Sequence, residues 1–186
     1  DVCSSDLSGE DPLFDEAMSL IGEYDSLLSK TAEGSDIYRI NHADGSPVEV
    51  DARTAELLSI ALSYASLSDG LVDPTIGTLS DLWSFGDTNE GIVPSREDIE
   101  EALSHIDYTK VKLSGNTVTL LDPKARLDLG FIAKGYIADK LKEFLTKNGV
   151  ENGIINLGGN VLTIGTKPDG SDYHIGVQKP FAETGT

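Results

Sequence analysis

The sequence has 186 residues, and its 14 Lys and Arg stand against 32 Asp and Glu, which gives a formal net charge of −18 at pH 7. The length fits one domain of ordinary size, roughly 100–200 residues. A chain this acidic repels phosphate backbones and anionic lipid surfaces, which argues against binding to nucleic acids or membrane surfaces. No apolar run reaches the roughly 18 residues of a membrane-spanning helix. A single cysteine, Cys3, excludes a disulfide framework and a cysteine-built zinc site.

Residues 1–11 are interpreted as a leader or a sequence artefact, and residues 12–186 as the domain itself. The first residues have neither a positively charged start nor an apolar stretch, so they do not form a signal peptide as they stand. A lipid anchor on Cys3 is one interpretation, although no lipobox precedes it. Residues 1–7 also resemble the translation of a common sequencing-library adapter, and we favour this second interpretation. We therefore expect the true start of the protein, with any export signal, to be missing.

The first half of the chain carries the helical pattern. Pro12 follows Asp11, a plausible N-cap, and apolar residues then recur at helical spacing as far as Leu28, which predicts a helix of about 16 residues. A second helix is predicted from about Ala52 to Ser66 by the spacing of its apolar residues, and it is expected to stop at Ser68–Gly70, where glycine supplies a left-handed exit.

Shorter elements fill the rest of this half. Polar residues predict a loop over 29–36, and a turn over 43–47 leads to a short strand at Val48 and Val50. A third helix is predicted to begin at Ser95, because serine is a good N-cap and acidic residues follow it in the first turn. The predicted buried face of this helix consists of Ile99, Ala102, Leu103 and Ile106.

The second half of the chain changes to the alternation that is typical of β-strands. Apolar residues alternate on both sides of Ser114–Asn116, which predicts a hairpin within 108–121. A strand over 127–130 and a helix from about Ile132 to Lys147 follow. Further strands are predicted at 154–157, 161–164 and 173–177. Because helices come first and strands later, we predict an α+β fold with helices packed on a mostly antiparallel or mixed sheet.

Two glycine-containing loops are candidates for ligand binding. Gly70–Thr75 places the Asp73 carboxylate, a rigid proline and a threonine hydroxyl in one segment. Ile155–Asn160 contains the pair Gly158 and Gly159 between two apolar runs. A helix end followed by an Asp-Pro turn explains the first loop without a ligand, and a plain hairpin turn explains the second about as well as a ligand cradle does.

The segment Asp128–Tyr136 indicates an anion site. Asp128 lies in a predicted strand, and a helix is predicted to begin within a few residues. Exposed backbone N–H groups are therefore expected close to Asp128. Lys134 in the first turn of that helix opposes the usual placement of cations, which favours a phosphate or pyrophosphate ligand. A simple N-cap role for Asp128 is the alternative. The three histidines lack the spacing of a zinc motif, and no G-x-S-x-G element of a serine hydrolase is present.

The order of these segments and their amino-acid sequences resemble those of the ApbE-type FAD:protein FMN transferases, from about residue 12 to the end of the chain. The matching motifs are Tyr38–Asn41, Gly70–Phe85, Asp128–Asp139, Ile155–Gly165, Lys167–Gly170 and Gly176–Pro180. In that family, FAD is split at its pyrophosphate, and the FMN moiety is passed through a phosphoester bond to a Thr or Ser hydroxyl of a target flavoprotein. AMP leaves, and Mg²⁺ commonly neutralises the phosphate oxygens. The resemblance therefore implies an ApbE-like fold, FAD as substrate and Mg²⁺ as cofactor.

The resemblance also implies which residues bind the nucleotide. Leu71, Val72 and Asp73 would line the flavin nucleotide site. Asp128 and Lys134 would contact FAD as the candidate catalytic residues, with Lys134 near the phosphates.

Other positions carried over from the family concern the metal and the floor of the site. The backbone carbonyl of Ala133 would be a Mg²⁺ ligand, while Asn156, Gly158 and Gly159 would shape the floor. Phe131 departs from the family, which usually has a small residue there, and this change is expected to alter the rim of the pocket.

A second departure is that the chain ends at Thr186, before the family's later Asp and Thr metal ligands. One carbonyl cannot satisfy Mg²⁺, which takes about six oxygen ligands. We therefore expect the parent protein to be a transferase and this piece to be inactive or nearly so.

Alternatives stay open for the function. One is a flavin-binding protein or Mg²⁺-dependent FAD pyrophosphatase without a protein target, and another is a non-enzymatic acidic module. The resemblance implies a target flavoprotein subunit as partner. It also implies export, either to the periplasm or to an anchored position on the outer side of the cytoplasmic membrane.

Overall fold

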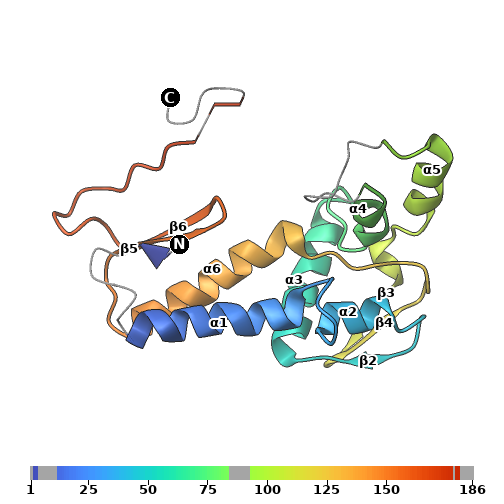
Figure 1. The fold of residues 1–186 in the computed structure, drawn as a ribbon, viewed down its shortest axis with the longest axis horizontal. Coiled ribbons are helices and arrows are strands. Elements are labelled where there is room, and N and C mark those ends of the chain that lie inside the picture. Colours follow the sequence, from blue (N-terminus) through green and yellow to red (C-terminus); the bar gives the residue numbers. More distant parts are fainter. Residues whose placement is uncertain (1, 4–11, 84–92, 178, 181–186) are drawn as a thin grey trace. The chain divides into compact units, whose positions relative to one another are not determined.

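The structure divides into two units. The computed structural model describes residues 2–3, 12–83, 93–177 and 179–180. One compact unit contains Asp1–Met18 and Ala138–Thr186, and the other contains Ser19–Ile137 (Figure 1). The predicted N-cap Asp11, most of the predicted leader and the end of the Gly70–Phe85 motif lie outside the described residues.

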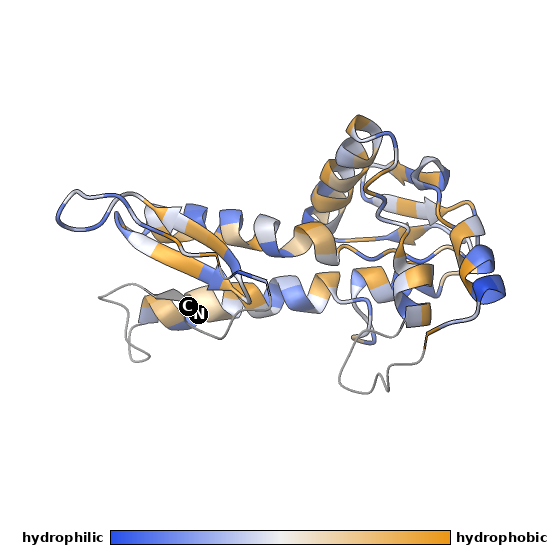
Figure 2. Ribbon diagram, turned by 90° about the horizontal axis from the view of Figure 1, so that it is seen from above, coloured by the Kyte–Doolittle hydropathy of each residue, from blue (hydrophilic) through white to orange (hydrophobic). Residues whose placement is uncertain are grey.

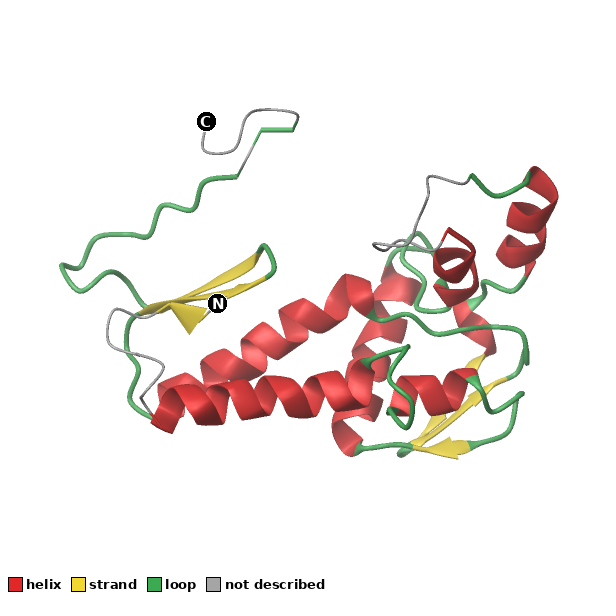
Figure 3. Cartoon of the chain, viewed as in Figure 1, coloured by secondary structure: helices red, strands yellow, loops and turns green. Residues whose placement is uncertain are grey.

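Helices are the main regular structure of the unit Ser19–Ile137 (Figure 3). Its helical elements are the end of α1 (Pro12–Leu28), α2 (Asp36–Asn41), α3 (Ala52–Leu67), α4 (Gly77–Trp83), α5 (Arg96–Ser104), the short 3₁₀ helix η1 (Tyr108–Lys110) and the start of α6 (Gly130–Lys147). The side chains of Ser35, Asp51 and Ser95 accept hydrogen bonds from first-turn N–H groups and so cap α2, α3 and α5. The three predicted helices of the first half are confirmed. Helices α2 and α4 were not predicted, because they are too short to show a helical period.

A three-stranded antiparallel sheet completes this unit. Its strand order is β2 (Val48–Glu49), β4 (Thr117–Leu120), β3 (Val111–Ser114). Gly115 has a φ of 57° in the turn between β3 and β4, and the predicted hairpin is confirmed. Val118 and Leu120 face the core. The helices and the segment before α6 contribute further core residues, among them Ile37, Ile40, Leu57, Leu58, Ala61, Leu127 and Leu129.

The unit of Asp1–Met18 and Ala138–Thr186 contains a second antiparallel sheet. Its strand order is β1 (Val2–Cys3), β5 (Gly153–Leu157), β6 (Asn160–Ile164), so the strands predicted at 154–157 and 161–164 are confirmed. Gly158 and Gly159 form the tight turn between β5 and β6, with φ of 59° and 92°. The fully buried side chains of this unit include Leu141, Leu145 and Ile155. The chain is α+β, as predicted, with two small antiparallel sheets instead of one.

Hydrophobic and hydrophilic residues alternate along the helices and along the β5–β6 hairpin (Figure 2). This alternation is expected of elements that bury one face only. Within the described part of the chain, no helix combines the length and the hydrophobicity needed to cross a membrane.

Three predicted features are wrong in detail. Residues 127–130 do not form a strand: the parallel bridge between Arg126 and Ile76 lies just before them, and Gly130 already belongs to α6. Residues 173–177 are not a strand either, since no described segment pairs with them. On α5, Ala102 is buried but Leu103 is 49% exposed, because the packed face of this helix is narrower than the sequence pattern suggested.

Candidate functional site

The extended segment that carries Asp128 is held from two sides. On one side, the buried amide of Asn41 accepts a hydrogen bond from the Leu127 N–H at 2.7 Å and donates one to the Leu127 carbonyl at 3.0 Å. On the other side, the Asp128 N–H donates to the Pro74 carbonyl at 2.9 Å. A side chain therefore replaces one neighbouring strand, which explains why this segment is straight without belonging to a sheet.

Gly77 allows the segment that carries Asp128 to lie close to the start of α4. Its N–H donates to the Arg126 carbonyl at 2.9 Å, where α4 begins. A Cβ atom at Gly77 would lie 2.7 Å from the Arg126 carbonyl carbon, well inside van der Waals contact. Glycine is needed here for the close approach of two backbones.

The Asp73 loop is organised by its own hydrogen bonds. Asp73 Oδ1 accepts from the N–H and the hydroxyl of Thr75, at 2.8 Å and 2.6 Å, and Oδ2 accepts from the Tyr108 N–H at 3.0 Å. Thr75 is fully buried, and its Oγ1 also accepts from the Asp107 N–H at 2.9 Å. These bonds support the Asp-Pro turn as the role of Asp73. Leu71 is 92% exposed beside it, and flavin contacts from Leu71, Val72 and Asp73 stay a prediction.

Asp128 lies in a group of polar side chains that we call the Lys30 cluster: Lys30, Ser80, Asp81 and Asp128. Asp128 Oδ2 is 2.9 Å from Lys30 Nζ and 2.8 Å from Ser80 Oγ. Lys30 Nζ also donates to Asp81 Oδ1 at 2.7 Å and to Ser80 Oγ at 2.8 Å. The other carboxylate oxygen, Asp128 Oδ1, accepts from the Gly130 N–H at 2.9 Å. Helix α6 begins at Gly130, so Leu129 and not Asp128 holds the N-cap position, and the N-cap interpretation of Asp128 is wrong by one residue. The Asp128 carboxylate still accepts from the first helical N–H, and it also forms an ion pair.

Both members of the ion pair are charged at neutral pH. Burial alone raises the pKa of Asp128, but hydrogen bonds from Lys30, the Gly130 N–H and Ser80 outweigh burial and leave the pKa below its usual range. For Lys30, burial lowers the pKa, and the hydrogen bonds to Asp81 and Asp128 outweigh it and raise the pKa. The cluster is therefore a true salt bridge.

Acid is expected to weaken the fold through this pair. Because the folded-state pKa of Asp128 is lowered, its stabilisation is present above the unfolded carboxyl pKa of about 4 and is lost as the pH falls through the folded value. We expect the urea-unfolding free energy of Asp128→Asn to fall less steeply than that of the wild type below about pH 5. Other carboxylates with lowered pKa titrate in both proteins, so the difference isolates Asp128; they are Asp51, Asp107, Asp122 and Asp169. If the unfolding free energies of the wild type and Asp128→Asn fell equally steeply with decreasing pH, the expectation would be contradicted.

A cavity of about 280 Å³ opens next to the Lys30 cluster. Its lining comes from the end of α1, the loop that follows and the start of α6: Tyr24, Asp25, Leu28, Ser29, Lys30, Asp128, Leu129, Gly130, Ala133, Lys134 and Ile137. The structure thus brings together Asp128, Ala133 and Lys134 from the predicted site. Within the described residues, no hydrogen bond or ion pair of the exposed Lys134 side chain is found. Its ammonium is available to a ligand.

The start of α6 differs from the prediction. The helix begins at Gly130 and not near Ile132, so Lys134 lies just beyond the first turn. The N–H groups of Gly130, Ile132 and Ala133 already donate, to Asp128 Oδ1 and to the Leu129 carbonyl. These three N–H groups are therefore not open to an anion, which leaves the Lys134 side chain as the main donor for one.

A pair of tyrosines packs behind the cavity. Tyr24 and Tyr136 meet edge to face with ring centroids 5.7 Å apart, and the Tyr136 hydroxyl donates to Glu56 at 2.6 Å. Burial, followed by the hydrogen bond to Glu56, raises the pKa of Tyr136, so this hydroxyl stays protonated. These contacts fix the first turns of α6 against α1 and α3.

The remaining predicted residues lie elsewhere. Leu71, Val72 and Asp73 do not line this cavity among the residues described. Gly158 and Gly159 belong to the other unit, where the Gly159 N–H donates to Asn156 Oδ1 at 2.9 Å within the β5–β6 turn. The hairpin-turn interpretation of the two glycines is thereby supported.

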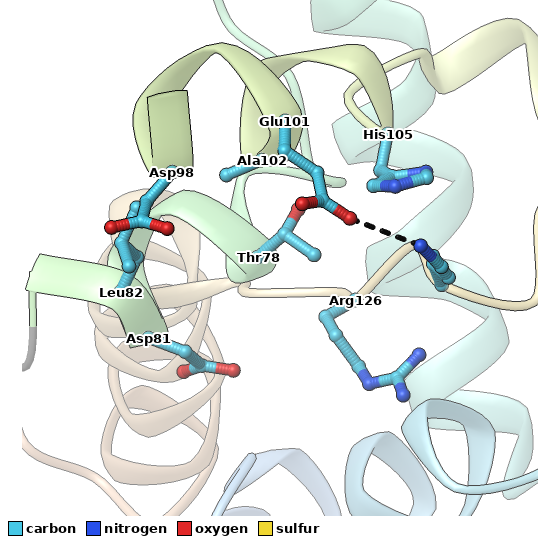
Figure 4. Close-up of a pocket in the computed structure, with 9 residues that line it drawn as sticks. Thr78, Asp81, Leu82, Asp98, Glu101, Ala102, His105 and Arg126 are labelled. Atoms are coloured by element: carbon cyan, nitrogen blue, oxygen red, sulfur yellow. Dashed lines mark hydrogen bonds and ion pairs between the residues drawn. The ribbon is translucent and has the colours of Figure 1, made fainter. Parts of the chain in front are cut away.

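A second cavity, of about 500 Å³, is lined by α4, α5 and the segment before Leu127 (Figure 4). Glu101 and Lys124 form an ion pair of 3.1 Å across part of it, as the dashed line in Figure 4 shows. Its lining residues are Thr78, Asp81, Leu82, Asp98, Glu101, Ala102, His105, Lys124 and Arg126. None of the predicted site residues is among them. Acidic and basic side chains are mixed here, so the lining does not select one ligand charge.

Two residues that build the site were missed by the sequence interpretation. Lys30 falls in a segment predicted only as a loop, and Asn41 was noted only as part of a matching motif. A lone lysine next to a helix end gives no local sign of a partner far along the chain. Nothing local marked Asn41 either, because the short helix that it ends could not be predicted.

The chain is similar to known proteins along most of its length. The sequence profile of the ApbE family matches residues 2–186. A FAD:protein FMN transferase of Klebsiella pneumoniae (strain 342) is 37% identical over 179 residues, which cover 95% of this chain and 54% of that protein. A FAD:protein FMN transferase of Treponema pallidum (strain Nichols) is 34% identical over 161 residues, with 82% and 44% covered.

Solved structures agree with the sequence comparison. The ApbE protein from Thermotoga maritima MSB8 superposes with a TM-score of 0.86 at 34% identity, covering 97% of this chain and 59% of that one. The flavin transferase ApbE from Vibrio cholerae gives a TM-score of 0.85 at 27% identity, with 96% and 58% covered. The chain spans about half the length of the curated relatives it matches. In sequence and in fold, this chain belongs to the ApbE family.

Proposed function

We propose that the protein containing this chain is a FAD:protein FMN transferase. It would break the bond between the FMN phosphorus and the oxygen that bridges the two phosphates of FAD, and join that phosphorus to a Thr or Ser oxygen of a target flavoprotein. AMP leaves with the bridging oxygen, and the acceptor hydroxyl gives up its proton. The observation that carries the proposal is that Asp128, Ala133 and Lys134 line one cavity at the start of α6. The names of the curated relatives support it.

Lys134 has the properties that phosphoryl transfer requires. The reaction depends on positioning and on neutralising phosphate oxygens, with little covalent work for the protein. Lys134 offers an exposed ammonium beside the cavity, in a protein whose net charge of −18 otherwise repels phosphates. We expect it to hold the diphosphate of FAD through charge-assisted hydrogen bonds.

Magnesium is part of the proposal, with one ligand from this segment. When bound, Mg²⁺ would neutralise phosphate oxygens, and the Ala133 carbonyl is the expected protein ligand. Ala133 lies inside α6, where a backbone carbonyl already accepts a hydrogen bond within the helix. Among the described residues, no group of three or more His, Cys, Asp and Glu side chains could hold a metal. The described residues alone do not form a magnesium site, so the cation that they bring to the phosphates is the Lys134 ammonium.

The partner and the compartment follow from the same proposal. The partner is a flavoprotein subunit with an acceptor Thr or Ser. We place the protein outside the cytoplasmic membrane, in the periplasm or anchored on the outer face, as expected from the resemblance in sequence.

Flavin titration tests the nucleotide site. Lys134→Ala is expected to weaken FAD binding about tenfold or more, because a charge-assisted hydrogen bond is worth about 1.5–3 kcal/mol. Riboflavin, which has no phosphate, should bind both proteins alike. Lys147→Ala is the matched control, since it removes an exposed ammonium from the last turn of the same helix. Equal FAD affinities for Lys134→Ala and the wild type would contradict the assigned role.

Product analysis tests the reaction itself. The protein is incubated with FAD, Mg²⁺ and a target flavoprotein domain, and the products are examined by mass spectrometry. Covalent FMN on the acceptor with release of AMP is the expected result. Free FMN and AMP without a modified acceptor would instead establish a FAD pyrophosphatase.

A further inference from the structure

Lys30 lies in the same cavity as Lys134 and has no role in the function proposed above. Lys30 and Asp128 line this cavity together with Lys134 and Ala133. Lys30 comes from the loop after α1, Ser80 and Asp81 from α4, and Asp128 from the segment before α6, so the cluster joins three separate parts of the unit Ser19–Ile137.

The two lysines of the cavity differ in what their ammonium groups bind. Lys30 Nζ has three N–H donors, and three protein acceptors lie within reach: Asp81 Oδ1 at 2.7 Å, Ser80 Oγ at 2.8 Å and Asp128 Oδ2 at 2.9 Å. Its hydrogen-bonding capacity is therefore used within the protein. Lys134 shows no such bond among the described residues, so it has donors left for a ligand.

The charges around the cavity explain why Lys30 matters to a ligand that it does not touch. The carboxylates of Asp25 and Asp128 and the ammonium groups of Lys30 and Lys134 line it, so their formal charges cancel. Without Lys30, the cavity would be net negative, and the Asp128 carboxylate would face an incoming diphosphate. Ser80 and the Gly130 N–H would still donate to Asp128, but neither donor is charged.

We propose that Lys30 is a positioning residue of the nucleotide site, which neutralises Asp128 and fixes its Oδ2 so that a diphosphate can bind beside Lys134. The inference rests on the proposed function and deepens it. Lys134 contacts the phosphates, and Lys30 acts through Asp128. The ligand class is a flavin nucleotide with at least one phosphate.

A ligand series and a double-mutant cycle test this division of roles. FAD, FMN and riboflavin are titrated into the wild type, Lys30→Met, Lys30→Arg, Asp128→Asn and the double variant Lys30→Met/Asp128→Asn. Lys30→Met is expected to weaken FAD and FMN binding about tenfold and to leave riboflavin affinity within about twofold. Lys30→Arg should restore most of the loss, because a guanidinium keeps the charge and the donors. In the Asp128→Asn background, Lys30→Met should change FAD affinity by no more than about twofold, since the Asp128 carboxylate through which Lys30 acts is no longer there.

The possible outcomes distinguish a failure of the role of Lys30 from a failure of the proposed function. Lys112→Met removes an exposed ammonium on β3 and should leave all three affinities unchanged. If Lys30→Met binds FAD as tightly as the wild type does, the role of Lys30 is overturned and the proposed function is left intact. If Lys30→Met weakens riboflavin binding as much as FAD binding, the effect is structural, and the role of Lys30 is again overturned. A wild type that binds none of the three flavins would overturn the proposed function and the role of Lys30 with it. If Lys30→Met does not fold, Lys30→Gln, which keeps a hydrogen-bond donor without the charge, takes its place in the same cycle.

Discussion

Gly77→Ala is expected to lower the free energy of unfolding by about 3 kcal/mol or more, because a Cβ atom would overlap the backbone of Arg126. Arg126 cannot move away like a flexible side chain, since its carbonyl accepts from the Gly77 N–H and the residues after it are held by Asn41 and Pro74. The variant should also lose FAD affinity, because the displaced segment carries Asp128. Urea unfolding followed by circular dichroism measures the first effect, and flavin titration measures the second.

Gly22→Ala is the matched control for this substitution. Gly22 is an exposed residue inside α1, and a Cβ atom there meets nothing within 4 Å. Alanine should stabilise the protein by up to about 1 kcal/mol, because glycine is a poor helix former. The same chemical change is thus expected to have opposite signs at the two positions. If Gly77→Ala were as stable as the wild type, the close approach of α4 and the Arg126 segment would be refuted.

Asn41→Ala is the second substitution with a large expected effect, a loss of about 2–4 kcal/mol. The side chain is 4% exposed, and its amide satisfies both the N–H and the carbonyl of Leu127. Removing it leaves two buried backbone groups without partners, which costs more than the lost bonds alone. Urea unfolding again gives the magnitude.

Two further variants make the Asn41 result specific. Asn41→Asp keeps the acceptor for the Leu127 N–H but sets a buried carboxylate oxygen against its carbonyl, so at neutral pH it should be at least as destabilising as Asn41→Ala. Asn148→Ala removes an exposed amide that donates to the Phe144 carbonyl at 2.9 Å, and it should change stability by less than about 0.5 kcal/mol. A loss in Asn148→Ala as large as in Asn41→Ala would mean that burial of the amide is irrelevant.

Local signals explain the parts of the fold that could be predicted from the sequence. Ser95 caps α5 with its own side chain, and Gly115 adopts the left-handed conformation that the β3–β4 turn requires. Such features depend on residues only a few positions apart. The helices at 12–28 and 52–66 were predictable for the same reason, since their apolar residues repeat over several turns.

The segment before α6 could not be predicted, because its partners are distant in sequence. Leu127 and Asp128 alternate with their neighbours as a strand would, which produced the incorrect prediction. Whether an extended segment joins a sheet depends on what lies beside it, and here a side chain, Asn41, occupies that place. The pairing of Lys30 with Asp128 was hidden for the same reason.

Three of the predicted site residues line the candidate cavity, but the electrostatics of that cavity could not be predicted. The resemblance indicated Asp128, Ala133 and Lys134, and these three line one cavity. It treated Asp128 as a ligand contact, whereas the structure gives that carboxylate a cationic partner and a role in beginning α6. A family pattern names positions, but it does not show which charges neutralise one another.

The hydrogen bonds between Asn41 and Leu127 also affect the order of folding. The two residues are 86 positions apart, so Asn41 leaves the ribosome several seconds before its partner at a synthesis rate of about 5–20 residues per second. Until Leu127 arrives, helix α2 ends in an amide that only water can satisfy. Pairings that close so long a loop form late and slow the search for the native state. We therefore expect the helices of the first half to form early and the cavity beside Lys134 to take shape near the end of folding.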